Sequence, residues 1–156
     1  MAQNDGLLIQ SQHKFFLNIT PGVEKPTYER LARGFSSFEP SMNEETDQTK
    51  YLDGGGLGTT TVMGGQVTFT FEGHRYFGDV VQDWLFSKFI KIGTERETTM
   101  KWEQPNGVVL EGPCTIATIE GPGGEAGEKG EISVEIHFNG TPIETAASVT
   151  PSKPKV

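Results

Sequence analysis

The stretch GGQVTFTFEGHRYFGDVVQDWLFS, residues 64–87, decides the fold because it joins the clearest strand pattern in the sequence to the clearest helix pattern. Its first half, residues 66–75, alternates between apolar and polar side chains. One set comprises Val67, Phe69 and Phe71, and the other comprises Gln66, Thr68, Thr70 and Glu72. A period of two predicts a strand with one buried face and one polar face.

The second half predicts a helix over about 79–92. Asp79 is a favourable N-cap, and Gln82 three residues later completes a capping-box pattern. Gly93 is a natural helix stop. An apolar stripe at helical spacing predicts that the helix packs flat on a sheet. The stripe consists of Val81, Trp84, Leu85, Phe89 and Ile92.

Strand patterns also lie on both sides of this stretch. They cover residues 13–19, 28–32, 35–42, 95–104, 108–111, 113–120 and 131–138. Pro40 places its strand at a sheet edge or a bulge, because proline cannot donate to a ladder. Ile116 and Ile119 stand three apart, which predicts a bulge. The order of elements predicts a single, mainly β domain over 1–156, a β-sandwich or half-open barrel with one flanking helix. Residues 1–12 are expected to be a flexible N-terminus and 140–156 an extended C-terminal tail.

Residues 43–65 are the least core-like part of the chain. They are polar and acidic, contain six glycines, and have β propensity near both ends. A loop of this length inside a compact domain is usually functional or disordered. The segment is too polar to bury within one subunit, so we interpret it as a long, hairpin-like arm that gains structure by pairing with a neighbour.

Composition excludes several classes of partner. The chain has 13 Lys and Arg against 21 Asp and Glu, a formal net charge of −8. Gripping a nucleic-acid backbone requires clustered basic residues, and an anionic membrane surface attracts the same residues. No apolar run approaches membrane-spanning length. Cys114, the one cysteine, lies in an apolar run without a basic neighbour, which favours a core position over a nucleophile.

No pattern of catalytic or ligand-binding residues stands out. The three histidines are far apart and lack metal-ligand spacing. The DGGGLG segment (53–58) leads into a β-type run rather than a helix, so it is not a phosphate cradle. The sequence therefore predicts a non-enzymatic protein without a catalytic residue, cofactor or metal.

Two strands carry polar second faces. The residues are Thr68, Thr70, Glu72, Glu131, Ser133 and Glu135. On these residues alone, the solvent face of a half-buried sheet is the favoured interpretation. The alternative is the wall of a water-filled lumen, where acidic side chains would repel DNA phosphates and let DNA slide without sticking.

The chain resembles the major tail tube proteins of long, flexible-tailed bacteriophages. The resemblance covers nearly the whole chain and is carried by KYLDGGG (50–56), by the stretch 64–87 quoted above, and by EGPCTIATIEGPGGEAGEKGEISVEIHFNGTP (111–142). It implies a β-sandwich with one flanking helix, hexameric rings that stack into a tube, and a lumen for DNA passage during genome ejection. It further implies partners among tape measure and tail-tip or terminator proteins, no specific DNA binding and no membrane contact. The implied location is the virion tail, with assembly in the host cytoplasm.

The resemblance also implies site residues. The arm at 43–65 would contact neighbouring subunits or rings, and the polar faces above would be candidates for the lumen. The arm residues expected at the interface are Glu44, Asp47, Tyr51, Leu52, Asp53, Leu57, Val62 and Met63.

Three alternatives remain open. A type VI secretion-like tube subunit shares the architecture. A small β-barrel could bind an apolar or carbohydrate ligand in a cavity lined by Phe69, Phe71, Trp84 and Trp102, although helix and strand stripes favour these aromatics as core. A hydrolase ranks last because no motif supports it.

Overall fold

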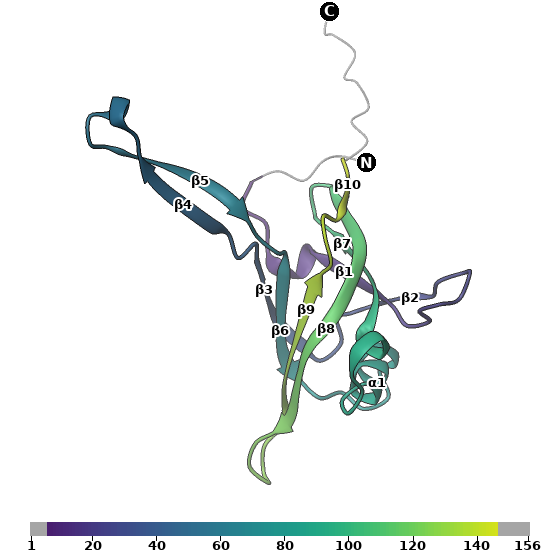
Figure 1. Cartoon of the computed structure of the whole chain (residues 1–156). Helices are drawn as coiled ribbons and strands as arrows, with labels where there is room; N and C mark the ends of the chain where they lie inside the picture. The colour runs from purple at the N-terminus through teal and green to yellow at the C-terminus, as the bar shows by residue number, and fades with distance from the viewer. Residues whose placement is uncertain (1–5, 147–156) are drawn as a thin grey trace, which may run out of the picture.

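The computed structural model of the chain describes residues 6–146, which form one large antiparallel sheet, a separate hairpin and one α-helix (Figure 1). The sheet has the strand order β2-β1-β7-β8-β9-β6-β3, with β10 paired to β8. Its strands are β1 (Lys14–Asn18), β2 (Tyr28–Arg30), β3 (Phe35–Ser41), β6 (Thr68–His74), β7 (Glu97–Glu103), β8 (Val109–Gly123), β9 (Glu131–Phe138) and β10 (Ile143–Thr145). The hairpin consists of β4 (Glu45–Lys50) and β5 (Gly58–Gly64).

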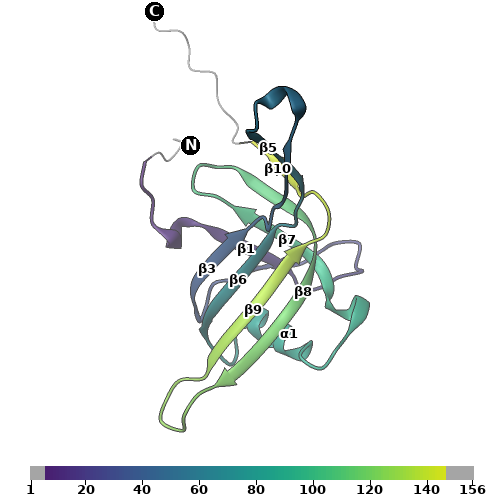
Figure 2. The ribbon, with the colours of Figure 1, turned by 60° about the vertical axis from the view of Figure 1, so that its left-hand side comes forward.

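The sheet curls so that its two ends face each other, which gives the predicted half-barrel (Figure 2). The ring of Phe15 on β1 lies 4.8 Å from Phe38 on β3 and 4.8 Å from Phe71 on β6, measured between ring centroids. Edge-to-face aromatic pairs of this kind add to the free energy of burial. The core inside the curl also contains Leu17, Phe69, Met100, Ile116, Val134, Ile136 and Phe138.

The alternating strands formed as predicted. On β6 and β9 every second side chain is buried, and the two strands pair in continuous register from Thr68↔His137 to His74↔Glu131. β3 lies at the edge of the sheet, as predicted for a strand that contains Pro40, because proline has no N–H to donate to a ladder. β7 begins two residues later than predicted, after a 3₁₀ turn (Gly93–Arg96).

β8 corrects the prediction of two separate strands at 108–111 and 113–120. It is one strand of 15 residues. Gly112 and Pro113 do not interrupt it, because its first part pairs with β7 and its second part with β9. The predicted bulge is present as a register shift between Ile116 and Thr118.

The helix α1 (Val80–Ser87) is shorter than the predicted 79–92. Asp79 caps it as predicted, since its side chain accepts a hydrogen bond from the Gln82 N–H at 3.1 Å. The helix ends at Lys88 (φ −93°, ψ 3°). The Arg96 guanidinium donates to the carbonyls of Phe89 and Lys91, so these carbonyls find partners outside a helix.

The ends of the helix differ from the prediction in two further ways. Phe89 and Ile92 are exposed rather than part of the buried stripe. The Gln82 side chain does not return to Asp79 but is fully buried, where it binds the carbonyls of Arg33 and His74.

The predicted termini are partly outside the described residues, which exclude 1–5 and 147–156. Within the N-terminal stretch, Gln10–Gln12 forms a 3₁₀ turn. Within the C-terminal tail, Ile143–Thr145 forms β10 and pairs with Val109–Glu111 of β8. No helix among the described residues is long and apolar enough to cross a membrane.

Candidate assembly surfaces

One face of the sheet gathers the residues that the sequence proposed for a lumen. The strands β3, β6, β9 and β8 lie side by side (Figure 2), and their outward positions form cross-strand rows. Thr70 pairs with Glu135, Glu72 with Ser133, and Thr68 and Glu131 continue the rows at either end of the same ladder. All six predicted residues therefore share this face, which we call the acidic face.

The structure adds residues that the sequence pattern missed. Glu39 on β3 lies beside Thr70, and Glu120 on β8 lies beside Ser133. Neither strand showed clean alternation, because Pro40 and the bulge after Ile116 disturb it. Strand pairing, rather than any single-strand pattern, is the signal that identifies them.

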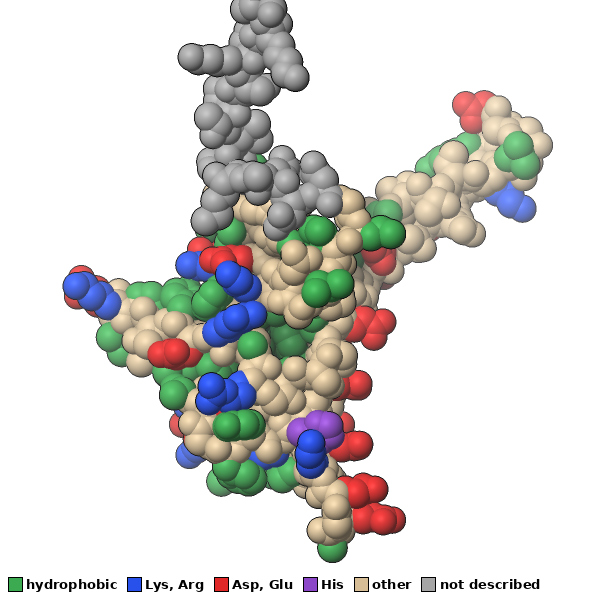
Figure 3. All heavy atoms as spheres, turned by 180° about the vertical axis from the view of Figure 1, so that it is seen from behind, with side chains coloured by type: hydrophobic (Ala, Val, Ile, Leu, Met, Phe, Trp, Pro, Cys, Tyr) green, Lys and Arg blue, Asp and Glu red, His purple; other side chains and the backbone are tan. Residues whose placement is uncertain are grey.

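The acidic face is defined as much by missing cations as by its carboxylates. None of the four strands contains a lysine or arginine. Figure 3 shows acidic side chains in a column along one edge of the molecule, from the base of the hairpin to the β8–β9 loop. With no counter-charge on these strands, the face keeps its negative potential, which is screened over about 10 Å at 0.1 M salt.

Hydroxyl groups hold one carboxylate in place on this face. Glu135 accepts a hydrogen bond from Thr70 at 3.4 Å on one side and from Thr118 at 3.1 Å on the other. The His137 ring lies on the same strand, with its Nε2 3.9 Å from Glu135. These contacts run across three strands, so the charge sits at a fixed place on the surface.

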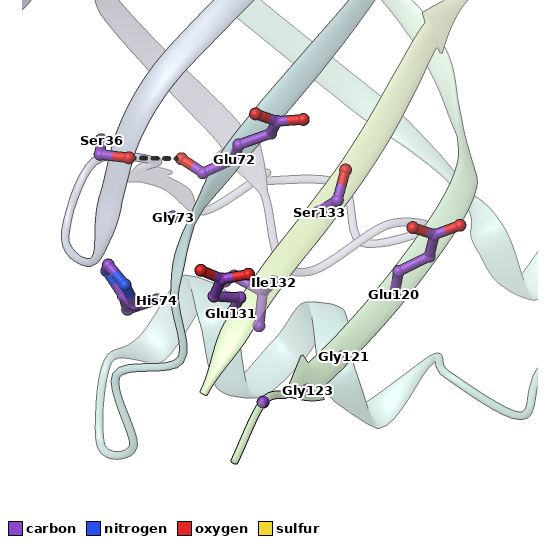
Figure 4. A pocket seen from close by; sticks show the side chains of 11 residues that line it. Ser36, Glu72, Gly73, His74, Glu120, Gly121, Gly123, Glu131, Ile132 and Ser133 are labelled. Carbon is purple, nitrogen blue, oxygen red and sulfur yellow. Dashed lines mark hydrogen bonds between the residues drawn. The ribbon is translucent and has the colours of Figure 1, made fainter. Parts of the chain in front are cut away.

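A shallow pocket lies at the end of the acidic face nearest the β8–β9 loop (Figure 4). Glu72, Glu120 and Glu131 line it from three neighbouring strands, and His74 stands at its margin. Among residues 6–146 no group of His, Cys, Asp and Glu has an arrangement that could hold a metal ion. The pocket is thus a concentration of negative charge at one end of the face.

The predicted arm is a hairpin that projects away from the body (Figure 1). β4 and β5 pair from Glu45↔Gly64 to Lys50↔Gly58, and Leu52–Gly54 forms a 3₁₀ turn at the tip. Every residue of β5 is exposed.

Five large apolar side chains of the arm are exposed: Tyr51, Leu52, Leu57, Val62 and Met63. Clusters of exposed apolar side chains mark interaction surfaces. Of the acidic arm residues, Glu44 and Asp53 are exposed, and Asp47 accepts a hydrogen bond from Thr49.

The base of the arm is tied to the sheet. Asn43 adopts a left-handed conformation (φ 50°), and its Nδ2 donates to the Gln66 carbonyl and to Thr68 Oγ1. The Gln66 N–H donates to the Met42 carbonyl at 2.7 Å. These bonds fix the arm as a continuation of β3 and β6.

The aromatic residues considered for a ligand cavity belong to the core. Phe69 and Phe71 are buried, and Phe69 packs edge-on against Trp102 with 5.2 Å between ring centroids. Trp84 is partly buried against the same core. All four side chains therefore belong to the hydrophobic core or pack against it.

Cys114 and His13 also pack against the core or its margin. Cys114 is fully buried, and burial raises the pKa of its thiol to about 12. His13 packs against Phe38 and Trp102 and accepts a hydrogen bond from the Trp102 indole, and partial burial lowers its pKa. A thiol without thiolate character is not a nucleophile at neutral pH.

Comparison with known proteins finds no matching family model and no matching curated protein. Solved structures do match. The tail of an empty gene transfer agent particle, solved with C6 symmetry, matches with a TM-score of 0.72 at 18% identity, over 90% of this chain and 100% of that one. The SPP1 tail tube matches with a TM-score of 0.56 at 10% identity, over 90% of this chain and 80% of that one. A chain of the PVC sheath–tube complex, from an extracellular contractile injection system, matches with a TM-score of 0.57 at 12% identity. The match covers 90% of this chain and 93% of that one. The chain therefore has the fold of phage-type tail tube proteins, as the sequence resemblance predicted.

Proposed function

We propose that this chain is the structural subunit of a phage tail tube, which assembles with itself into stacked hexameric rings and conducts DNA through its lumen. The observation that carries the proposal is the acidic face, a four-stranded surface without a lysine or arginine, on a fold shared with tail particles. The C6 symmetry of the gene transfer agent tail supports the hexameric ring. The site of action is the virion tail, after assembly in the host cytoplasm.

Ring formation has a physical route in the two open edges of this surface. β3 pairs with β6 on one side only, and residues 117–123 of β8 pair with β9 only, because β7 begins at Glu97, opposite Thr115. Exposed edges favour pairing with another chain. If β3 of one subunit joins β8 of the next, the acidic faces form one closed surface and no edge remains.

A closed acidic wall suits DNA passage. Proteins that hold DNA neutralise its phosphates with Lys and Arg, and a wall without these residues makes no such contact. Repulsion acts within about a Debye length of the surface, roughly 10 Å at 0.1 M salt, so it keeps the duplex off the wall. DNA would slide through without specific binding.

The arm supplies contacts beyond the ring. Its exposed apolar side chains, including Tyr51, Leu52 and Leu57, have no core of their own to enter, so they suit a neighbouring subunit or ring. The ends of such a tube would meet the tape measure and the tail-tip or terminator proteins.

A shortened arm tests this proposal. Gln48 and Thr60 are paired in the hairpin, so residues 49–59 can be replaced by Asn-Gly, which forms a two-residue turn between paired strands. Circular dichroism should show a folded chain with an unfolding midpoint close to the wild type, while sedimentation and electron microscopy should show loss of tubes. Tubes formed by the shortened protein would contradict the role of the arm.

A second candidate is the tube subunit of a contractile injection system, related to type VI secretion tubes. The match to the PVC sheath–tube complex favours it. Isolation of the native particle separates the two, because a contractile system surrounds its tube with a sheath and a flexible phage tail carries DNA without one.

A further inference from the structure

The segment between β6 and α1 carries a second exposed apolar surface, which we call the aromatic end surface. It consists of Tyr76, Phe77 and Val80, together with Arg33 from the β2–β3 loop. Phe77 is 74% exposed and Val80 is 52% exposed. Aromatic residues and arginine are the residue types most enriched in protein interfaces.

Two arginines hold the aromatic rings in place. The Arg75 guanidinium lies 4.3 Å from the Phe77 ring centroid and 4.7 Å from that of Phe86. The Arg75 side chain is only 7% exposed, forms an ion pair with Asp83 at 2.8 Å and donates to the Tyr76 carbonyl. Arg33 lies 5.1 Å from the Tyr76 ring. A surface fixed in this way loses little conformational entropy on binding.

A recess adjoins the rings, between the end of β2 and the start of α1. Arg30, Arg33, Gly78 and Val80 line it, along with Glu29 and Asp79. Asp79 is occupied by capping the helix. The recess therefore places two guanidinium groups and two carboxylates beside the side chain of Val80.

The arm has the complementary chemistry. Residues 44–53 contain four carboxylates, on Glu44, Glu45, Asp47 and Asp53, against the single cation of Lys50. The tip adds the exposed side chains of Tyr51, Leu52 and Leu57. The apolar arm tip matches the exposed rings of the aromatic end surface in polarity, and the guanidinium groups of Arg30 and Arg33 can pair with arm carboxylates.

The two surfaces lie at opposite ends of β6. The arm joins the sheet just before Thr68, and Tyr76 follows two residues after His74. A strand of seven residues spans about 20 Å, and the arm points away from α1 (Figure 1). The arm and the aromatic end surface of one subunit therefore cannot contact each other. A contact between unlike surfaces of identical chains produces closed rings or open-ended assemblies.

We propose that the aromatic end surface receives the arm of another copy of this chain. This inference rests on the proposed function, because it names the acceptor of the arm within the tube. The contact is head to tail, so every added subunit presents a new arm and a new acceptor.

Cysteine cross-linking tests the pairing. Native Cys114 is buried and stays out of the reaction, so Leu52→Cys in the arm and Val80→Cys in the acceptor are the reactive positions. With both changes in one chain, a short bismaleimide should give a ladder of covalent multimers from assembled protein. An equal mixture of the two single variants should give covalent dimers and little beyond.

A matched pair of charge variants gives a second readout. Val80→Asp places a carboxylate in the recess, at the first residue of the helix where it does not disturb the fold. Val23→Asp makes the same change in the β1–β2 loop at 58% exposure. Val80→Asp should raise the concentration needed for assembly by about tenfold or more, and Val23→Asp should leave it unchanged.

The outcomes separate the two claims. If wild-type protein forms tubes but Leu52 and Val80 do not cross-link and Val80→Asp assembles like Val23→Asp, the acceptor assignment is wrong and the proposed function stands. Cross-linking of Leu52→Cys alone, from arm to arm, also overturns it. If the wild-type chain forms no tubes, the proposed function itself fails.

Discussion

The Thr118 hydroxyl on β8 donates a hydrogen bond of 3.1 Å to Glu135 on β9. Thr70 on β6 binds the other oxygen of the same carboxylate from the opposite side. Three strands thus contact one carboxylate, and none of β3, β6, β8 and β9 contains a lysine or arginine. The acidic face is an organised surface whose charge has no counterpart on its own strands.

Reversing charges on this face should make the tube hold DNA. Glu72 and Glu120 are exposed there, and the double variant Glu72→Lys/Glu120→Lys should keep its free energy of unfolding within about 0.5 kcal/mol. Its assembled tubes should retain short duplex DNA, and the retention should fall steeply as salt rises. Filter binding of labelled duplex measures the effect.

The control is Glu24→Lys, which makes one such charge reversal in the exposed β1–β2 loop. Wild-type and Glu24→Lys tubes should retain little DNA. Equal retention by all three proteins would mean that the acidic face does not line the DNA path.

The direction of the arm should depend on one glycine. A Cβ on Gly65 would lie 2.7 Å from the Met42 carbonyl oxygen, whereas a Cβ on Gly64 would meet nothing within 4 Å. Gly65→Ala should displace the arm base and weaken tube assembly, and Gly64→Ala should assemble normally. Sedimentation of the two variants at equal concentration provides the comparison, and identical behaviour would refute the fixed arm base.

Gln82 should contribute strongly to stability. Its buried amide accepts from the Tyr76 N–H at 2.8 Å and donates to the carbonyls of Arg33 at 2.8 Å and His74 at 3.1 Å. Gln82→Leu leaves these backbone groups without partners and should cost about 2–4 kcal/mol of unfolding free energy. Urea denaturation measures it, with the exposed Gln10→Ala as a control expected within about 0.5 kcal/mol.

Cys114 should be unreactive in the folded protein. Burial raises its pKa to about 12, so the folded chain keeps its thiol proton at pH values where an unfolded thiol, with a pKa of about 8.5, has lost it. Unfolding is therefore increasingly favoured as pH rises between those two values. Iodoacetamide labelling at pH 9 should be slow in buffer and fast in urea, and rapid labelling of folded protein would show that the site opens.

The sequence predicted the elements whose own side-chain periodicity shows which face is buried. β6 and β9 alternate because one face is buried, and the half-barrel and the exposed arm followed from the same patterns. The predicted helix end was wrong. Phe89 and Ile92 continue a helical spacing, but the Arg96 guanidinium binds the carbonyls of Phe89 and Lys91, which a longer helix would use.

Other features were mispredicted or not identified because they depend on contacts between different strands or loops. Gly112-Pro113 reads as a break, yet β7 and β9 hold β8 together from both sides. Glu39 and Glu120 join the acidic face only through pairing with Thr70 and Ser133. The aromatic end surface depends on Arg33 and Arg75 meeting rings across a loop, which no spacing within the sequence indicates.

Electron microscopy of the purified wild-type protein tests the central claim most directly. At high concentration, or with a tail-tip initiator, the protein should form hollow tubes of stacked six-fold rings. A reconstruction should place Glu72, Glu120 and Glu135 on the inner wall. A protein that stays monomeric under both conditions, or a tube lined by the opposite face of the sheet, would contradict the account.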